Sequence, residues 1–247
     1  MTTEKHETTH AAHFVLQGKG GVGKSLIASL ATQYLADNGR LEACFDTDPV
    51  NGSLQSVEAL KAQSIPLLNN DTLNVKAVDR LMGAIIQAKA EIVVDNGAAS
   101  FLPLSRYLVE NSAAAFLAEH GAATVIHTVV TGGANGLDTL KGLDALVRHF
   151  VPAASIVVWV NEYFGPARFD GTDFENTAVY RDHQSNIRGL VYLRKLDPVM
   201  FAPNFTEMLD LHMTFAQAAE SDHFELMEKS RLFRIKSEIW CQLGSVI

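Results

Sequence analysis

The sequence predicts a doubly wound α/β fold, with a mainly parallel sheet and helices on both of its faces. Short apolar runs alternate with helical patterns along the chain, which is typical of successive βα units. One run leads into a glycine-rich segment that fits the phosphate-binding pattern G-x-x-x-x-G-K-[ST]. With 247 residues, 47% of them hydrophobic, the chain is long enough to bury one sizeable core. We expect a flexible tail at 1–12 and a single P-loop ATPase domain at 13–247.

The first predicted elements are a strand, a glycine loop and a helix, in that order. Residues 13–17 form a short apolar run, and the loop follows at 18–25. The next apolar side chains recur at helical spacing until Asn38 and Gly39, which are typical helix-ending residues. A strand, a glycine loop and a helix in this order are the context that a phosphate-binding loop requires. The alternative is a plain glycine-rich turn before a helix, which would match this order and the loop pattern only by chance.

Each residue type in the loop suits the binding of ATP and Mg²⁺. Glycines allow positive φ angles and let backbone N–H groups approach phosphate oxygens. Lys24 would neutralise the β- and γ-phosphates, and the Ser25 hydroxyl would coordinate Mg²⁺. We therefore expect ATP to contact Gly18, Lys19, Gly20, Gly21, Val22, Gly23, Lys24, Ser25 and Leu26.

Two acidic segments follow predicted strands. The strand at 41–46 runs into Asp46-Thr47-Asp48-Pro49, and the strand at 91–95 ends in Asp95. Because ligands bind beyond the carboxyl ends of parallel strands, these carboxylates are candidates for the magnesium site. One aspartate could orient the attacking water, and Asp95 would reach Mg²⁺ through a water molecule. The alternatives are an Asp-Pro turn and a capped strand end.

The loop Lys19-Gly20-Gly21-Val22-Gly23-Lys24-Ser25 resembles the deviant Walker A loop of the ParA/MinD family of ATPases. The resemblance implies that Lys19 reaches the phosphates of a partner protomer in an ATP-dependent homodimer. It also implies a catalytic Asp48, acting with Lys19 and Lys24, and a supporting Asp46 near Mg²⁺. The family's adenine-contacting asparagine ends a late strand, and Asn161 at the end of 155–161 matches it. Otherwise Asn161 is a turn former at a strand end.

A narrower resemblance spans most of the chain. The stretches 94–98, 126–133 and 158–161 look like those of TraL-type proteins of conjugative plasmids, which are relatives of StbB. It implies a nucleotide-dependent switch in conjugative DNA transfer, with a relaxosome, the coupling machinery or a DNA-binding adaptor as partner. Partition ATPases usually carry a proline after the Asp95 position, where this chain has Asn96-Gly97-Ala98. That departure disfavours a standard partition role.

Composition narrows the alternatives. The net charge of −8 and the lack of a basic run disfavour strong direct DNA binding, so a partition ATPase that binds DNA itself is the second hypothesis. A metabolic ligase or kinase that shares the loop is the third. Two cysteines without metal-ligand spacing, no secretory signal and no membrane-spanning run predict a cytoplasmic protein. His6, His10 and His13 are expected in or beside the flexible tail.

The remaining predictions concern the outer parts of the domain. We expect an extra helix and strand within 52–90, a strand at 122–130 and a helix from Leu137. Thr131-Gly132-Gly133 is either a nucleotide-sensing loop or a turn. Residues 162–186 are predicted to leave the core, with a short helix near 175–180 and either a partner-binding or a filling role. A capping box begins at Thr214, and the final helix is expected from Asp222, docked on the domain rather than on a membrane.

Overall fold

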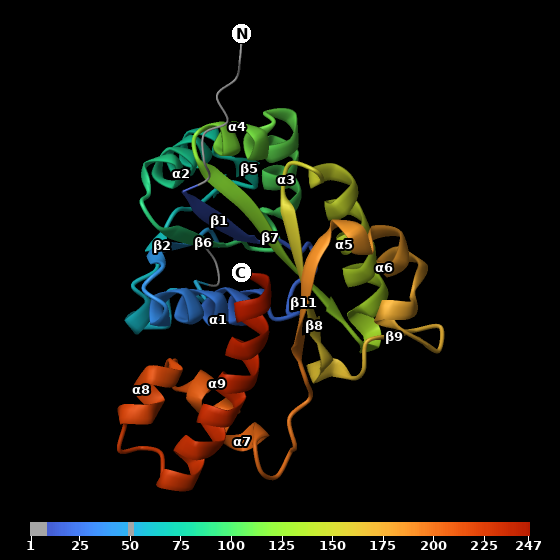
Figure 1. The fold of residues 1–247 in the computed structure, drawn as a ribbon. Helices are drawn as coiled ribbons and strands as arrows, with labels where there is room; N and C mark the ends of the chain where they lie inside the picture. The colour runs from blue at the N-terminus through green and yellow to red at the C-terminus, as the bar shows by residue number, and fades with distance from the viewer. Residues whose placement is uncertain (1–8, 49–51) are drawn as a thin grey trace.

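A seven-stranded parallel sheet forms the centre of the protein (Figure 1). The computed structural model describes residues 9–48 and 52–247. The strand order is β11-β8-β7-β1-β6-β2-β3, with β1 in the middle. The predicted fold class is confirmed. The strands are β1 (His10–Val15), β2 (Leu41–Asp46), β3 (Gln63–Ser64), β6 (Glu91–Asp95), β7 (Ala122–Thr131), β8 (Ser155–Asn161) and β11 (Ile187–Leu193).

Helices cover both faces of the sheet, and each face has its own apolar core. One core is closed by α2 (Val75–Gln87), α3 (Phe101–Glu110), α4 (Ala113–Glu119) and α5 (Gly136–Phe150). The other is closed by α1 (Lys24–Asp37), α7 (Ala202–Asp210), α8 (Phe215–Glu220) and α9 (Leu226–Val246). Short 3₁₀ turns occupy Glu58–Leu60, Gly133–Asn135, Glu162–Phe164, Phe174–Asn176 and Gln184–Asn186.

Two small antiparallel hairpins lie outside the central sheet. The first consists of β4 (Leu68–Asn69) and β5 (Thr72–Leu73), and it precedes α2 in the segment where an extra helix and strand were expected. The second consists of β9 (Arg168–Phe169) and β10 (Thr172–Asp173). It is followed by α6 (Ala178–His183), which packs beside α5. The predicted excursion between β8 and β11 therefore contains a hairpin as well as a short helix.

Strand register brings the carboxyl ends of three central strands together. Val15 of β1 pairs with Asp95 of β6, and Asp95 pairs in turn with Asp46 of β2. On the other side of β1, Thr131 of β7 pairs with Asn161 of β8. The chain continues from β1 to β2 on one side of it, and β7 lies on the other side, so this edge is the topological switch point of the sheet.

The first strand begins earlier than predicted. The boundary between tail and domain was expected at residue 13, but β1 starts at His10, which pairs with Ala122 of β7. His10 and His13 are buried, and the His10 imidazole hydrogen-bonds the carbonyl of Ile85. The placement of His10 in the tail was therefore wrong, because polar side chains that find buried partners can continue a strand. His6 lies outside the described residues.

The final helix begins at Leu226, four residues later than predicted. Glu225 and Glu228 form its capping box, and the buried Phe224 anchors the preceding turn. The helix packs on β11 and on α1, where the Trp240 indole donates to Asp37. As a result, α1 is covered on its outer side as well as by the sheet. Among the described residues, no helix is long and apolar enough to cross a membrane.

The two cysteines occupy contrasting environments. Cys44 is buried in β2, and Cys241 is exposed on α9; both are free thiols. Burial raises the pKa of the Cys44 thiol to about 11, and the thiol donates to the carbonyl of Leu60 at 3.4 Å. The Cys44 thiol therefore stays protonated and unreactive near neutral pH.

A hydrogen-bonded chain of buried side chains crosses four strands. The Trp159 indole donates to Nδ1 of His127 at 2.9 Å, so His127 must carry its proton on Nε2. That proton is donated to Nδ1 of His13 at 2.9 Å, and His13 then donates from Nε2 to Glu91. Glu91 also forms an ion pair with Arg40. His127 is neutral in this arrangement, since a proton added at its Nδ1 would face the indole N–H of Trp159.

We expect His127 to make the free energy of unfolding fall in mild acid. Burial holds the pKa of His127 well below 6.5, and the neighbouring side chains of His13 and Arg188 add to that shift. Below pH 6.5 the unfolded chain binds a proton at this residue that the folded chain does not, so stability falls as the pH falls. From pH 6.5 to 5.5, wild type should lose about 1 kcal/mol more than His127→Gln.

The comparison cancels the other titrating groups. Denaturant unfolding of wild type, His127→Gln and His120→Gln at several pH values measures how the free energy of unfolding changes with pH. His120 is an exposed control residue beside α4. A wild-type pH dependence that survives unchanged in His127→Gln would contradict the assignment.

Candidate functional site

The predicted phosphate loop lies between β1 and α1, at the carboxyl edge of the sheet. Gly21 and Gly23 have φ angles of 71° and 103°, which L side chains rarely adopt. Gly18 faces the ring of Phe101, and a β-carbon built on Gly18 would lie 2.8 Å from that ring. The helix α1 starts at Lys24, so its first N–H groups face the loop. This geometry is an anion cradle at a helix N-terminus.

Lys24 is folded into its own loop. The residue is 8% exposed, and its Nζ donates to the carbonyl of Lys19 at 2.9 Å. Burial lowers the pKa of Lys24, and the carboxylates of Asp95 and Asp48 oppose that shift. A buried ammonium between a glycine loop and a helix N-terminus would suit a multiply charged anion.

Lys19 lies in a different environment from Lys24. Its Nζ forms an ion pair with Asp138 Oδ2 at 2.9 Å, with side chains that are 39% and 54% exposed. Asp138 belongs to the first turn of α5, and its pKa is held low by the hydrogen bond from Lys19. The loop thus carries one buried lysine and one lysine at the rim, and sequence reasoning missed the aspartate that holds the second.

Asp46 organises the segment that follows β2. It is 1% exposed; its Oδ1 accepts from the amide of Asp48, and its Oδ2 accepts from the amides of Leu54 and Gln55. Backbone amides therefore already occupy both oxygens, which makes Asp46 a loop anchor. Pro49, Val50 and Asn51 of the predicted acidic motif lie outside the described residues.

Asp95 is a buried carboxyl group at the same edge of the sheet. It is 3% exposed, and burial raises its pKa to about 6, while the hydroxyl of Ser25 and the charge of Lys24 lower it in part. Within residues 9–48 and 52–247, its Oδ1 finds no hydrogen-bond partner. An orphaned buried carboxylate oxygen suits a cation or a water molecule held by one.

Asp48 approaches the same point from the neighbouring loop. A β-carbon built on Gly97 would lie 2.8 Å from its carboxylate, so Asp48 lies directly over the turn that follows β6. Its charge raises the pKa of both Lys24 and Asp95. The structure therefore brings Lys24, Ser25, Asp48 and Asp95 together.

The donor set fits Mg²⁺ bound with a nucleotide. No group of three or more His, Cys, Asp or Glu side chains forms a metal cage in the described part of the chain. Mg²⁺ in nucleotide sites keeps several waters and binds one or two protein groups together with phosphate oxygens. The Ser25 hydroxyl and the Asp95 carboxylate would supply such a partial set.

Asn161 supports the phosphate loop from β8. Its Nδ2 donates to the carbonyl of Val22 at 3.0 Å, and its Oδ1 accepts from the amide of Tyr163 at 3.1 Å. A β-carbon on Gly23 would lie 3.0 Å from the same amide nitrogen. The side chain is 5% exposed, so it braces the loop; its predicted contact with adenine would use the remaining N–H of Nδ2.

The loop at 131–133 packs as a tight turn. A β-carbon on Gly132 would lie 2.3 Å from the carbonyl oxygen of Pro166, and one on Gly133 would lie 2.9 Å from that of Phe164. The glycines are therefore required by backbone contact between two neighbouring loops. This close packing explains their identity without a sensing role.

The fold and site together define a P-loop NTPase of the ParA/MinD kind. The structure is similar to a chain of the MinC:MinD cell division protein complex of Aquifex aeolicus, with TM-score 0.53, 13% identity and coverage of 96% and 97% of the two chains. It is also similar to MinD with Mg-ADP from Pyrococcus horikoshii OT3, with TM-score 0.51, 15% identity and coverage of 93% and 96%. At these identities the likeness establishes the fold.

Sequence relatives identify the family more narrowly. No family model matches the chain. Two Escherichia coli proteins, each called Protein TraL, are 39% and 37% identical over 233 and 231 residues. The matches span 94% of this chain and 97% and 96% of those proteins. The chain belongs to the TraL family.

Proposed function

We propose that this protein binds and slowly hydrolyses ATP, and that it acts as a nucleotide-dependent dimeric switch in conjugative plasmid DNA transfer. The observation that carries the proposal is the contrast between two lysines of one loop. Lys24 is buried beside Asp95, whereas Lys19 is partly exposed and paired with Asp138 at the rim. The proposal assigns Lys24 to the protomer's own phosphates and Lys19 to the phosphates of a second protomer.

The chain's own residues would divide the chemistry as follows. Bound ATP and Mg²⁺ supply the transferable phosphoryl group and the charge that neutralises it. The glycine loop's amides and Lys24 hold the phosphates, and Ser25 and Asp95 orient the metal, Asp95 through water. Asp48 would position the attacking water. The second protomer of the dimer would contribute its Lys19 to the site. Asp46 and Asn161 keep the two loops in place.

The output of such a switch is assembly on a partner. Membership of the TraL family supports a role in plasmid conjugation, and the MinD-like fold supports a nucleotide-controlled homodimer. We infer partners among conjugation proteins: a relaxosome, the coupling machinery or a DNA-binding adaptor. Residues 13–247 would act as one ATPase domain in the cytoplasm.

Direct DNA binding is the second candidate, because the phosphate loop resembles that of the ParA/MinD family, which includes partition ATPases. The net charge of −8 weighs against it. Filter binding of the ATP-loaded protein to duplex DNA at increasing salt separates the two. Affinity that falls steeply with salt would favour a partition ATPase, and no binding without an adaptor would favour the switch.

The central test is the molar mass in solution with ADP and with ATP and Mg²⁺. The monomer has a mass of 26.9 kDa, so a dimer that forms with ATP alone would support the switch. A protein that stays monomeric with both nucleotides would contradict an ATP-dependent dimer in free solution. It would favour either a metabolic enzyme or a switch that assembles only on a partner.

Asp138→Asn is expected to favour the ATP dimer. Lys19 must leave Asp138 to reach another protomer, and neutralising the aspartate weakens the contact that competes. Because the pair is exposed, we expect the dimer dissociation constant to fall only roughly two- to fivefold. Sedimentation with ATP and Mg²⁺ measures it, with Asp173→Asn as the control for loss of an exposed ion pair, that with Arg168. A weaker dimer in Asp138→Asn would contradict the competition.

A further inference from the structure

The turn after β6 lies directly beneath Asp48. This turn, Asn96-Gly97, belongs to the segment in which the chain departs from partition ATPases. A β-carbon built on Gly97 would lie 2.8 Å from Cγ and from Oδ2 of Asp48, and 2.9 Å from its Cβ. Because the Asp48 β-carbon is itself this close, rotating the Asp48 side chain would not make room for a side chain at residue 97. The absence of a β-carbon at Gly97 is therefore what lets Asp48 occupy its position.

The residue before Asp48 is fastened to the end of β6. Thr47 is fully buried, and both its amide and its hydroxyl donate to the carbonyl of Asp95, each at 3.0 Å. The same hydroxyl lies 3.3 Å from Asn96 Oδ1. Two hydrogen bonds from one residue to one carbonyl oxygen fix the backbone at Thr47. The next residue, Asp48, is thereby held over the turn.

The turn itself is anchored to the start of α3. Asn96 and Ser100 are 0% and 1% exposed, and the Ser100 hydroxyl donates to Asn96 Oδ1 at 2.8 Å. The side-chain amide of Asn96 donates to the carbonyl of Gly97 at 2.9 Å. One residue after Ser100, Phe101 packs against Gly18 of the phosphate loop. The turn is therefore held between the phosphate loop, through α3, and the end of β2.

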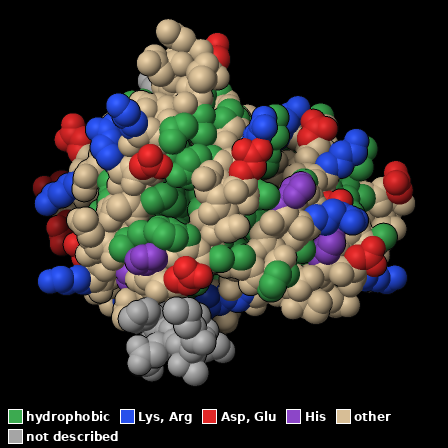
Figure 2. Space-filling model, turned by 90° about the horizontal axis from the view of Figure 1, so that it is seen from above, with side chains coloured by type: hydrophobic (Ala, Val, Ile, Leu, Met, Phe, Trp, Pro, Cys, Tyr) green, Lys and Arg blue, Asp and Glu red, His purple; other side chains and the backbone are tan. Residues whose placement is uncertain are grey.

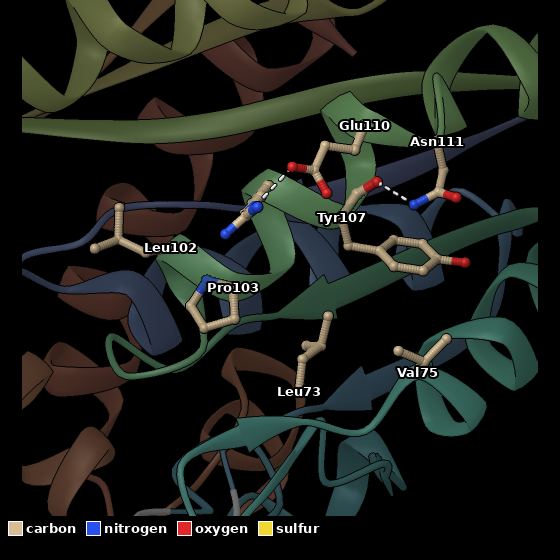
Figure 3. Close-up of a pocket in the computed structure, with 8 residues that line it drawn as sticks. Leu73, Val75, Leu102, Pro103, Tyr107, Glu110 and Asn111 are labelled. Atoms are coloured by element: carbon tan, nitrogen blue, oxygen red, sulfur yellow. Dashed lines mark hydrogen bonds and ion pairs between the residues drawn. The ribbon is translucent and has the colours of Figure 1, made fainter.

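The outer side of α3 is open to solvent. Leu102 is 73% exposed, and with Pro103 and Tyr107 it lines an open pocket of about 660 Å³ between α3 and the start of α2 (Figure 3). The helices at the top of Figure 1 form this face, where hydrophobic side chains gather between charged groups (Figure 2). The contacts that join α3 to the turn are thus confined to its buried start, at Ser100 and Phe101.

Asp48 needs restraint because other carboxylates surround it. Asp46 and Asp95 end two paired strands, and the charge of Asp48 acts on both Asp95 and Lys24. Carboxylates this close repel one another, which favours movement of Asp48 away from the site unless the backbone holds it. Asp46 contributes to that hold, because its Oδ1 accepts the amide of Asp48 at 3.0 Å.

We propose that Thr47 and Gly97 are positioning residues that hold Asp48 in the candidate site before nucleotide binds. Thr47 acts by fixing the backbone to the end of β6, and Gly97 acts by leaving the space that Asp48 occupies. The effect of this placement on ATP turnover rests on the proposed function, whereas the placement itself does not.

Gly97→Ala tests the space beneath Asp48. Pushing Asp48 off the turn breaks the bond from its amide to Asp46, so this amide should exchange with solvent about tenfold faster or more in the nucleotide-free protein. Amide hydrogen exchange followed by NMR measures the rate. Gly83→Ala is the matched control, because a β-carbon on Gly83 meets nothing within 4 Å. Unchanged exchange at Asp48 in Gly97→Ala would overturn the placement.

The Thr47 hydroxyl is tested by a nearly isosteric change. Thr47→Val removes one of the two bonds to Asp95, so the Asp48 amide should again exchange faster, whereas Thr47→Ser should retain the wild-type rate. Thr128→Val is the control, since Thr128 is buried in β7 and its hydroxyl has no hydrogen-bond partner in the part of the chain that the structure describes. Equal exchange in Thr47→Val and Thr47→Ser would overturn the role of the hydroxyl. This pair also decides the proposal if Gly97→Ala does not fold.

Turnover is measured on the same variants with ATP and Mg²⁺. A displaced Asp48 should lower kcat about tenfold or more, while the dissociation constant of ATP stays within about threefold of wild type, because Lys24 and the loop amides are unchanged. If ATP binding weakens as much as kcat falls, the variants distort the whole site and the positioning role is overturned. Wild-type kcat in Gly97→Ala with faster exchange at Asp48 would overturn the link between placement and turnover.

The two readouts separate this proposal from the proposed function. If the wild-type protein binds ATP but does not hydrolyse it, the proposed hydrolysis fails. The exchange rates of the nucleotide-free variants then still decide whether Thr47 and Gly97 hold Asp48 in place.

Discussion

Lys24→Ala is expected to lower the affinity for ATP by about 100-fold or more, since charge-assisted hydrogen bonds from a buried ammonium to phosphate are lost. Lys24 is buried in the phosphate loop and lies near Asp95 and Asp48. Removing its charge leaves these carboxylates to repel the phosphates. Calorimetric titration of wild type and the variant with ATP and Mg²⁺ measures the loss.

The matched control for this prediction is Lys89→Ala, which removes an exposed lysine between α2 and β6. It should bind ATP as wild type does. Because Lys24 also bonds the carbonyl of Lys19, the unfolding temperature of both variants is measured as well. A folded Lys24→Ala protein within about threefold of wild-type affinity would contradict the assigned phosphate site.

Lys19→Ala is expected to keep ATP binding and to lose dimerisation. Its side chain points to the rim and pairs with Asp138, so little of the protomer's own phosphate binding depends on it. The molar mass with ATP and Mg²⁺ should stay at 26.9 kDa at concentrations where wild type forms a dimer. Wild-type behaviour of Lys19→Ala in both binding and mass would exclude a dimer with lysines exchanged between sites.

Asp48→Ala should give the opposite phenotype in the same assay. Without the carboxylate that positions water, ATP remains bound and the dimer persists. The alanine retains the β-carbon beside Gly97, so the turn after β6 keeps its packing. A variant that returns to monomer as fast as wild type after ATP addition would remove Asp48 from the catalytic role.

Local patterns were sufficient for most of the central fold. Strands at 41–46, 91–95 and 155–161 are fully buried at their carboxyl ends, and their apolar runs are continuous, so their type and bounds follow from sequence. The edge strand β11 was not predicted, because its half-buried residues give neither a continuous run nor a clean alternation. The helix α3 was missed because Pro103 reads as a break, although proline is tolerated in a first turn.

The residues of the candidate site also fall into those that the sequence predicts and those that it does not. The loop at 18–25 and the three aspartates belong to short contiguous motifs, so sequence placed them together. Asp138 lies 119 residues from Lys19, and nothing in the local sequence of α5 marks it as that lysine's partner. The bracing role of Asn161 depends on Val22 in another loop. Contacts of this kind are set by the register of distant strands, which a single sequence does not encode locally.

The contrast between the two thiols provides a reporter without mutagenesis. Cys44 is buried and its pKa is about 11, whereas Cys241 faces solvent on α9. A maleimide dye should therefore attach to the natural protein at one position only. Two labelled populations, one with a donor and one with an acceptor dye, would then follow association of protomers in real time by energy transfer. Each round of nucleotide addition and loss could be observed on the unmodified sequence.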